Sequence, residues 1–71
     1  MTTATFQYGE TFKYGGKRDV TAAWCIRRRE SGEIVRKGFS LDRARAEKSA
    51  ASVFTDYHLT KPSYIEIVDI D

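Results

Sequence analysis

The chain has 71 residues, of which 41% are hydrophobic and 13% aromatic, and its formal net charge is +2. This length fits one domain spanning residues 1–71, and the aromatic content argues against intrinsic disorder. One cysteine and one histidine can form neither an internal disulfide nor a structural zinc site, and no apolar stretch approaches the roughly 18 residues that cross a membrane. We therefore expect a cytoplasmic domain with no metal, no cofactor and no membrane contact.

The charge is distributed unevenly along the chain. Residues 1–40 contain eight Lys or Arg against four Asp or Glu, whereas residues 41–71 contain four against six. A basic first half and a mildly acidic second half give the surface a polar field. The overall cationic excess is nevertheless small for a dedicated DNA-binding domain.

The N-terminal segment carries aromatic residues at alternate positions. Phe6, Tyr8, Phe12 and Tyr14 share one parity, which predicts a strand over 6–14 with one packed face. We interpret these rings as core residues, and the alternative is a surface on which nucleobases stack. Gly15 and Gly16 then predict a hairpin turn, because glycine adopts positive φ at no steric cost. A second strand is predicted over 20–29 and a third over 34–39.

The turn between the second and third strands lies at Glu30-Ser31-Gly32-Glu33. Gly32 fits the left-handed position of a type I turn with a bulge, or a two-residue loop. In the two-residue register Trp24 faces Phe39, and the predicted helix-facing side consists of Trp24, Ile26, Val35 and Phe39. The opposite side then consists of Cys25, Arg27, Arg29, Ile34 and Arg36. A slip of one residue would exchange the two sides.

This hairpin concentrates cationic residues. The predicted register makes Arg27, Arg29 and Arg36 an exposed basic triangle, while Arg28 and Lys37 point toward the core face and reach its rim or are turned outward by a bulge. Guanidinium groups bind phosphates and carboxylates bidentately, and a two-stranded ribbon fits the DNA major groove. In the alternative interpretation, nearby acidic residues make the patch an ordinary solvated face; these are Glu10, Asp19, Glu30 and Glu33. The candidate partner-binding residues are Arg27, Arg28, Arg29, Arg36 and Lys37.

The clearest predicted element is a helix that follows Ser40, the expected N-cap, with Asp42 in its first turn. Its apolar sector contains Ala46, Ala50, Val53, Phe54 and Tyr57. Arg43 and Glu47 could pair at a spacing of four, and Pro62 prevents continuation. Residues 64–70 predict a last strand that joins the sheet parallel to its neighbour through a right-handed crossover.

The element order β-β-β-α-β indicates an α+β fold. We expect a three-stranded antiparallel meander, one helix packed on the sheet and a C-terminal strand. No catalytic set is visible, because no nucleophile, base and orienting group are placed together, so we expect no enzymatic activity. Cys25 is interpreted as an unreactive strand residue and His58 as a cation at the helix end. The acidic residues near the end of the chain predict a solvated edge or a contact for a basic partner; they are Glu66, Asp69 and Asp71.

Residues 24–53 resemble two groups of known proteins. Their hairpin, Phe39-Ser40 exit and alanine-rich helix look like the arm-type DNA-binding domain of tyrosine recombinases, which departs from this chain by lacking the added last strand. They also resemble small phage-encoded ββαβ proteins, including several type I anti-CRISPR proteins, whose last strand opens as Pro62-Ser63-Tyr64 does here. Many of those inhibitors are acidic, whereas this chain is mildly basic.

The two resemblances imply different partners for the same arginine-rich hairpin. The phage proteins imply a non-enzymatic inhibitor that docks on a host protein or ribonucleoprotein complex handling nucleic acid, in the cytoplasm of the host cell. The recombinase domain implies a small DNA- or RNA-binding domain. The sequence leaves open which of the two partners is bound and whether the exposed sheet also forms a homodimer.

Overall fold

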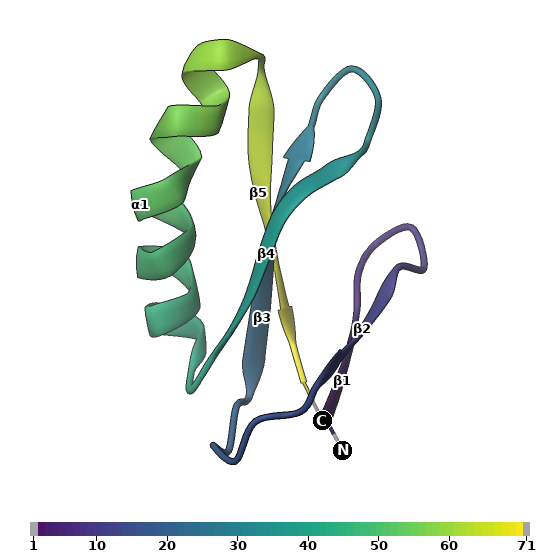
Figure 1. Ribbon diagram of the computed structural model, residues 1–71, viewed down its shortest axis with the longest axis vertical. Helices are drawn as coiled ribbons and strands as arrows, with labels where there is room; N and C mark the ends of the chain where they lie inside the picture. The colour runs from purple at the N-terminus through teal and green to yellow at the C-terminus, as the bar shows by residue number, and fades with distance from the viewer. Residues whose placement is uncertain (1, 71) are drawn as a thin grey trace.

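The computed structural model describes residues 2–70, which form five strands and one helix (Figure 1). The elements are β1 (Thr2–Thr5), β2 (Thr11–Tyr14), β3 (Ala22–Arg28), β4 (Ile34–Ser40), α1 (Arg43–Thr60) and β5 (Ser63–Asp69). The predicted α+β class, with one helix packed on an antiparallel sheet and a C-terminal strand, is confirmed.

The main sheet has the strand order β4-β3-β5, and β3 is antiparallel to both of its neighbours. β4 and β5 therefore run parallel to each other with β3 between them. The prediction that the last strand joins parallel to its neighbour is wrong, because the crossover through α1 passes over β3. β3 is the central strand, and both of its faces and both of its edges are covered. Residues 22–27 are therefore all buried.

The N-terminal segment forms a hairpin of its own rather than one strand over 6–14. β1 pairs antiparallel with β2, and the chain reverses where the Phe6 N–H donates to the Glu10 carbonyl at 2.8 Å. Gly9 has φ of +89° in this turn, a conformation that glycine adopts freely. The predicted hairpin turn at Gly15-Gly16 is also wrong, since within residues 2–70 β2 pairs with β1 and not with β3. Residues 15–21 instead connect the two sheets.

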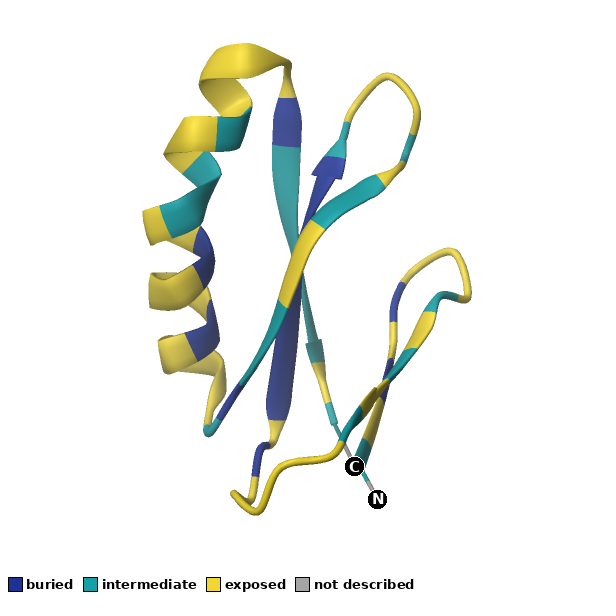
Figure 2. Ribbon diagram, viewed as in Figure 1, coloured by how far each residue is buried: buried dark blue, intermediate teal, exposed yellow. Residues whose placement is uncertain are grey.

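The main sheet lies between α1 and the N-terminal hairpin (Figure 1). On the helix side Trp24 and Ile26 pack with Ala46 and Ala50 of α1. On the other side Ala23 and Cys25 pack with Phe6 and Ala4 of the N-terminal hairpin. Figure 2 shows the result as an almost unbroken buried stretch along β3.

Helix α1 begins two residues later than the sequence predicts. Asp42, not Ser40, is the N-cap, and its Oδ1 accepts from the Arg45 N–H at 2.8 Å. Ser40 ends β4 instead. The predicted apolar sector is confirmed on the sheet side, and the predicted pair between Arg43 and Glu47 forms at 3.9 Å.

The register of β3 and β4 differs by one residue from the predicted one. Trp24 pairs with Gly38, and Val35 is skipped as a bulge next to Ile26. The slip arises from the loop and the bulge together. The Arg28 N–H donates to the Glu33 carbonyl around the four residues 29–32, which shifts the pairing by two residues, and the bulge at Val35 returns one. Gly32 has the predicted positive φ, at +74°. The slip moves Phe39 to the side of the N-terminal hairpin, contrary to the prediction.

Gly38 provides the space in which the Trp24 ring packs. A Cβ at Gly38 would lie 2.6 Å from three atoms of that ring. We expect Gly38→Ala to destabilise the protein by about 1–3 kcal/mol, because overpacking a filled core displaces side chains. Urea denaturation measures the change.

The control is Gly15→Ala, since a Cβ at Gly15 would meet no heavy atom of residues 2–70 within 4 Å. The two variants carry the same chemical change in different surroundings. Equal stability of both would contradict the role assigned to Gly38.

Candidate functional site

Arg27, predicted to be exposed, is 0% exposed in the structure. Its five N–H groups all have acceptors. Nη1 donates to Glu10 Oε2 at 2.6 Å and to the Gly32 carbonyl at 2.7 Å, Nη2 donates to Glu10 Oε1 at 3.1 Å and to Glu66 Oε1 at 3.0 Å, and Nε donates to Glu66 Oε1 at 3.2 Å. The ring of Tyr8 lies 4.6 Å from the guanidinium carbon. The exposed triangle is therefore wrong for Arg27.

Glu66 shares this burial and is not part of a solvated acidic edge. Its side chain is 11% exposed, and its Oε2 accepts from the Gln7 N–H at 2.5 Å. Glu66 comes from β5, Arg27 from β3 and Glu10 from the turn of the N-terminal hairpin. We call these three residues the buried charge cluster after its fully buried arginine; the side chain of Glu10 is 31% exposed at its margin. Of the other acidic residues predicted at this edge, Asp69 pairs with Arg43 at 3.4 Å, and Asp71 lies outside the described residues.

The charges of the cluster reinforce one another. The hydrogen bonds from Arg27 lower the pKa of Glu10 to about 2, against an opposing effect of desolvation. The bonds to Glu10 and Glu66 raise the pKa of Arg27. A buried arginine that contacts two carboxylates is neutralised inside the fold, and it has no N–H left with which to bind a partner.

Arg28 points to the helix side at the rim of the core, as predicted, and it is also bound within the fold. Its Nη1 donates to the Tyr57 carbonyl at 2.7 Å, the Lys61 carbonyl at 3.1 Å and Ser63 Oγ at 3.1 Å. These acceptors surround the C-terminal end of α1, where the helix dipole favours a cation. Arg28 thus provides a hydrogen-bond donor for carbonyl groups at the C-terminal end of α1.

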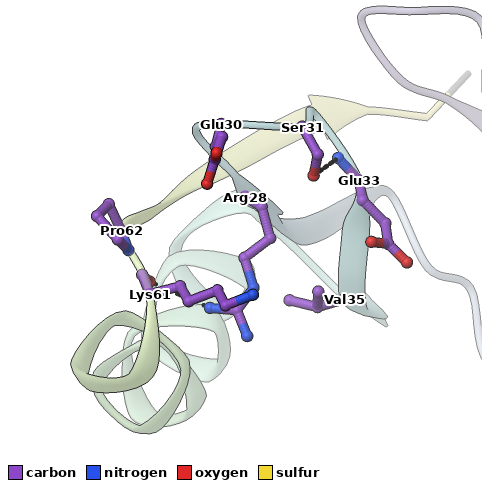
Figure 3. Close-up of a pocket in the computed structure, with 7 residues that line it drawn as sticks. All are labelled: Arg28, Glu30, Ser31, Glu33, Val35, Lys61 and Pro62. Carbon is purple, nitrogen blue, oxygen red and sulfur yellow. Dashed lines mark hydrogen bonds between the residues drawn. The ribbon is translucent and has the colours of Figure 1, made fainter.

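A cleft of about 360 Å³ lies beside Arg28, between the β3–β4 loop and the end of α1. Figure 3 shows Arg28 and Lys61 on one side of it and the residues of the loop on the other. Glu30 and Glu33 line the cleft together with the two cations. Because its charges are mixed, this cleft is poorly suited to an anionic partner.

The remaining predicted residues are exposed on different parts of the surface. Arg29 lies with its guanidinium carbon 5.5 Å from the Tyr64 ring. Arg36 pairs with Ile26, whose side chain packs on the helix side. Lys37 lies on the opposite side of β4, with Nζ 4.5 Å from the Phe12 ring. Arg36 and Lys37 therefore lie on opposite faces of β4, and Arg29 lies on another part of the surface.

β4 is an outer strand of the sheet, and no strand of residues 2–70 pairs with its outer edge. Two surface hollows include residues of β4 in their lining. One of about 350 Å³ is lined by residues 34–37. The next, of about 600 Å³, is lined by Arg18, Phe39, Ser40, Leu41, Arg45, Lys48 and Ser49. No described residue that lines either hollow is acidic.

Five exposed cations line these hollows, and we call them the basic edge: Arg18, Arg36, Lys37, Arg45 and Lys48. Within the part of the chain that the structure describes, Arg45 alone among them pairs with an acid, Asp42, at 3.4 Å. Both of those side chains are more than half exposed, so the pair contributes only about 0–1 kcal/mol. The basic edge is available to an anionic partner.

Sequence reasoning identified Arg36 and Lys37 and missed the other three members. Arg45 and Lys48 lie on the polar side of the helix, three residues apart, and Arg18 precedes β3. The spacing of three between Arg45 and Lys48 was the available sequence signal, because it places both cations on the same side of the helix. It does not reveal that this face lies beside β4.

The two residues considered for chemistry have structural roles. Cys25 is fully buried, and burial raises its pKa to about 11, so its thiol stays protonated at neutral pH. His58 stacks on Phe54, and its Nδ1 accepts from the Ser63 N–H at 3.2 Å. This bond connects the last turn of α1 to the start of β5.

Among residues 2–70 no group of three or more His, Cys, Asp or Glu is arranged to hold a metal ion. The described helix is not long and apolar enough to cross a membrane. Comparisons with protein-family models, with curated proteins and with solved structures gave no match.

Replacing Arg27 by Met tests the buried charge cluster. Glu10 and Glu66 would lose their cation, and Glu66, whose side chain is 11% exposed, would keep a largely buried charge without its partner. A domain of this size has only roughly 4–10 kcal/mol of stability, so we expect a large loss in urea denaturation. Adding Glu10→Gln and Glu66→Gln to Arg27→Met should restore part of the loss. Wild-type stability of Arg27→Met would contradict the assignment.

The pH dependence of stability tests Glu10 separately. Folding lowers the pKa of Glu10 from 4.5 to about 2, so its ionised form stabilises the fold at all pH values above 4.5. This contribution is lost as the pH falls from 4.5 to about 2, because protonation removes the charge that Arg27 binds. We expect Glu10→Gln to be less stable than wild type at neutral pH and to lose less stability across that interval.

Urea denaturation at several pH values measures the slope of the free energy of unfolding against pH. The control is Glu30→Gln, because Glu30 makes no ion pair with residues 2–70, and this variant should keep the wild-type slope. An unchanged slope in Glu10→Gln would contradict the prediction.

Proposed function

We propose that this protein acts by binding rather than by catalysis, and that the basic edge is its contact surface for an acidic partner protein. One observation carries the proposal: five exposed cations line two hollows that border the outer strand β4, and the described lining of these hollows contains no acid. Two of the cations outside this edge, Arg27 and Arg28, are bound by acceptors within the fold.

The distribution of charge favours one acidic surface over polyanions in general. The net charge is only +2, so long-range attraction to nucleic acid is weak. The basic edge is local and directional, which gives specificity and a faster association with a complementary surface. The resemblance to phage-encoded inhibitors of the anti-CRISPR kind suggests the specific form of the proposal. In that form the partner is a host complex that handles nucleic acid, and binding inhibits it.

A second candidate function is binding of DNA or RNA through the same edge. The larger hollow favours it, because Arg18, Arg45 and Lys48 surround it together with the serines Ser40 and Ser49. Guanidinium, ammonium and hydroxyl groups are common phosphate ligands. This function predicts that log K falls by about 0.9 per phosphate neutralised on duplex DNA as log salt rises.

Charge reversal tests the proposal with two matched double variants. Arg36→Glu with Lys48→Glu alters the basic edge, and Arg29→Glu with Lys61→Glu alters two exposed cations elsewhere. Both variants change the formal net charge equally. Each protein is used for affinity capture from nuclease-treated lysate of the organism in which the sequence occurs or of its host, with mass spectrometry as the readout.

We expect wild type and the Arg29/Lys61 variant to enrich the same acidic protein and the Arg36/Lys48 variant to lose it, because its edge then repels carboxylates. Equal capture by the two variants would refute the proposal. Fluorescence anisotropy with single-stranded and duplex oligonucleotides at low salt runs in parallel. Strong binding that only the Arg36/Lys48 variant loses would favour the second candidate function.

A further inference from the structure

We infer that the basic edge receives an extended acidic segment of the partner protein, which pairs with β4 as an additional strand of the sheet. This inference rests on the proposed function and specifies the form of the partner. Strand addition joins the backbone of an extended peptide to an unpaired sheet edge, while pockets beside the edge accept its side chains.

The usable part of the edge is the stretch 36–40. Val35 is skipped by the ladder as a bulge, and a bulge bends and twists its strand. Beyond it the pairing of β4 with β3 is regular from Arg36 to Ser40. Five residues of strand extend about 17 Å. An added strand of this length can form several backbone hydrogen bonds.

The two hollows border the two ends of this stretch of β4. The hollow at residues 34–37 borders the start of the stretch, and the hollow beside Phe39 and Ser40 borders its end. Successive side chains of a strand point to opposite faces of the sheet. The cations match this alternation, since Arg36 lies on the helix side and Lys37 on the side of the N-terminal hairpin. Carboxylates on both faces of the added strand would meet cations.

A second copy of this chain fits the edge poorly. Antiparallel pairing of two stretches 36–40 would centre on Gly38, which places the Lys37 residues of the two copies at diagonal positions on one face and brings the two basic edges together. Like charges across a strand pair are destabilising. An acidic segment of another protein meets the opposite situation at every one of these positions.

Nucleic acid also fits the edge less well than a peptide does. The unpaired side of a strand presents carbonyl oxygens as well as N–H groups. A phosphate accepts hydrogen bonds and cannot satisfy the carbonyls, whereas a peptide backbone supplies both donors and acceptors. The bulge and the two cations are also devices by which sheets discourage unwanted pairing. The cations disfavour a basic strand and attract an acidic one, and the bulge confines pairing to the regular stretch 36–40.

The test uses a short blocked peptide that repeats Glu-Glu-Val-Val, which places carboxylates on both faces of a strand, and the same peptide with an N-methyl group on every residue. N-methylation of every residue removes the backbone donors along both edges of the peptide and leaves its charge unchanged. Fluorescence anisotropy gives the affinity of both peptides for wild type, for the Arg36/Lys48 variant and for the Arg29/Lys61 control variant. Hydrogen exchange, measured residue by residue, reports on the amides of β4.

We expect the unmodified peptide to bind wild type and the Arg29/Lys61 variant, and to slow exchange within residues 36–40. The N-methylated peptide should bind wild type at least roughly tenfold more weakly, because paired backbone groups are lost. Failure of the unmodified peptide to bind, equal affinity of the two peptides, or unchanged exchange at 36–40 would overturn strand addition.

The outcomes separate this inference from the proposed function. Equal affinity of the two peptides, with binding lost in the Arg36/Lys48 variant, would overturn strand addition and support an acidic partner held by charge alone. Equal binding of the unmodified peptide to the Arg36/Lys48 and Arg29/Lys61 variants would count against the basic edge itself. If residues 36–40 are protected in a dimer of this chain, the occupant of the edge is a second copy and not a peptide. If an oligonucleotide displaces the peptide from these residues, the occupant is nucleic acid.

Discussion

The guanidinium of Arg27 joins four segments that are distant in the sequence: β3, the turn of the N-terminal hairpin, the β3–β4 loop and β5. The N-terminal hairpin contains only two short strands, and such a hairpin is marginally stable by itself. Arg27 and the apolar contacts around Phe6 hold it against the sheet. Because Arg27 is fully buried and Glu66 nearly so, losing one of them leaves a buried charge without its partner. The layer that covers the second face of the sheet therefore depends on this interaction.

The same interaction decides which cations can meet a partner. Arg27 and Arg28 are adjacent in the sequence, yet one is bound by two carboxylates on one face and the other by helix-end carbonyls on the opposite face. The run of three arginines thus has a mainly structural role. The surface available for binding moves from the hairpin tip to the outer edge of β4, where cations from α1 and from the loop before β3 join Arg36 and Lys37.

The prediction succeeded where local patterns were sufficient. The period of the apolar residues located α1 and its packed face, and Gly32 was placed correctly at a positive φ. It failed where two local solutions were nearly equivalent. A two-residue loop and a four-residue loop both fit the turn between β3 and β4. The four-residue loop shifts the pairing by two residues and the bulge at Val35 returns one, so residues 36–40 end on the opposite faces from those predicted. Packing of the Trp24 ring over Gly38 is compatible with the observed register, and no local pattern reports it.

The sequence by itself determined the α+β class, the helix and its apolar face, the absence of any disulfide within the chain, and the strong bias of cations toward the first half. Those properties depend on composition and on spacing along the chain. Tertiary structure alone decided that Arg27 is neutralised, that β3 is central, and that Arg18, Arg45 and Lys48 lie beside β4. Each of these outcomes requires contact between residues far apart in sequence, and charge carries no information about its partner until the fold brings the two together.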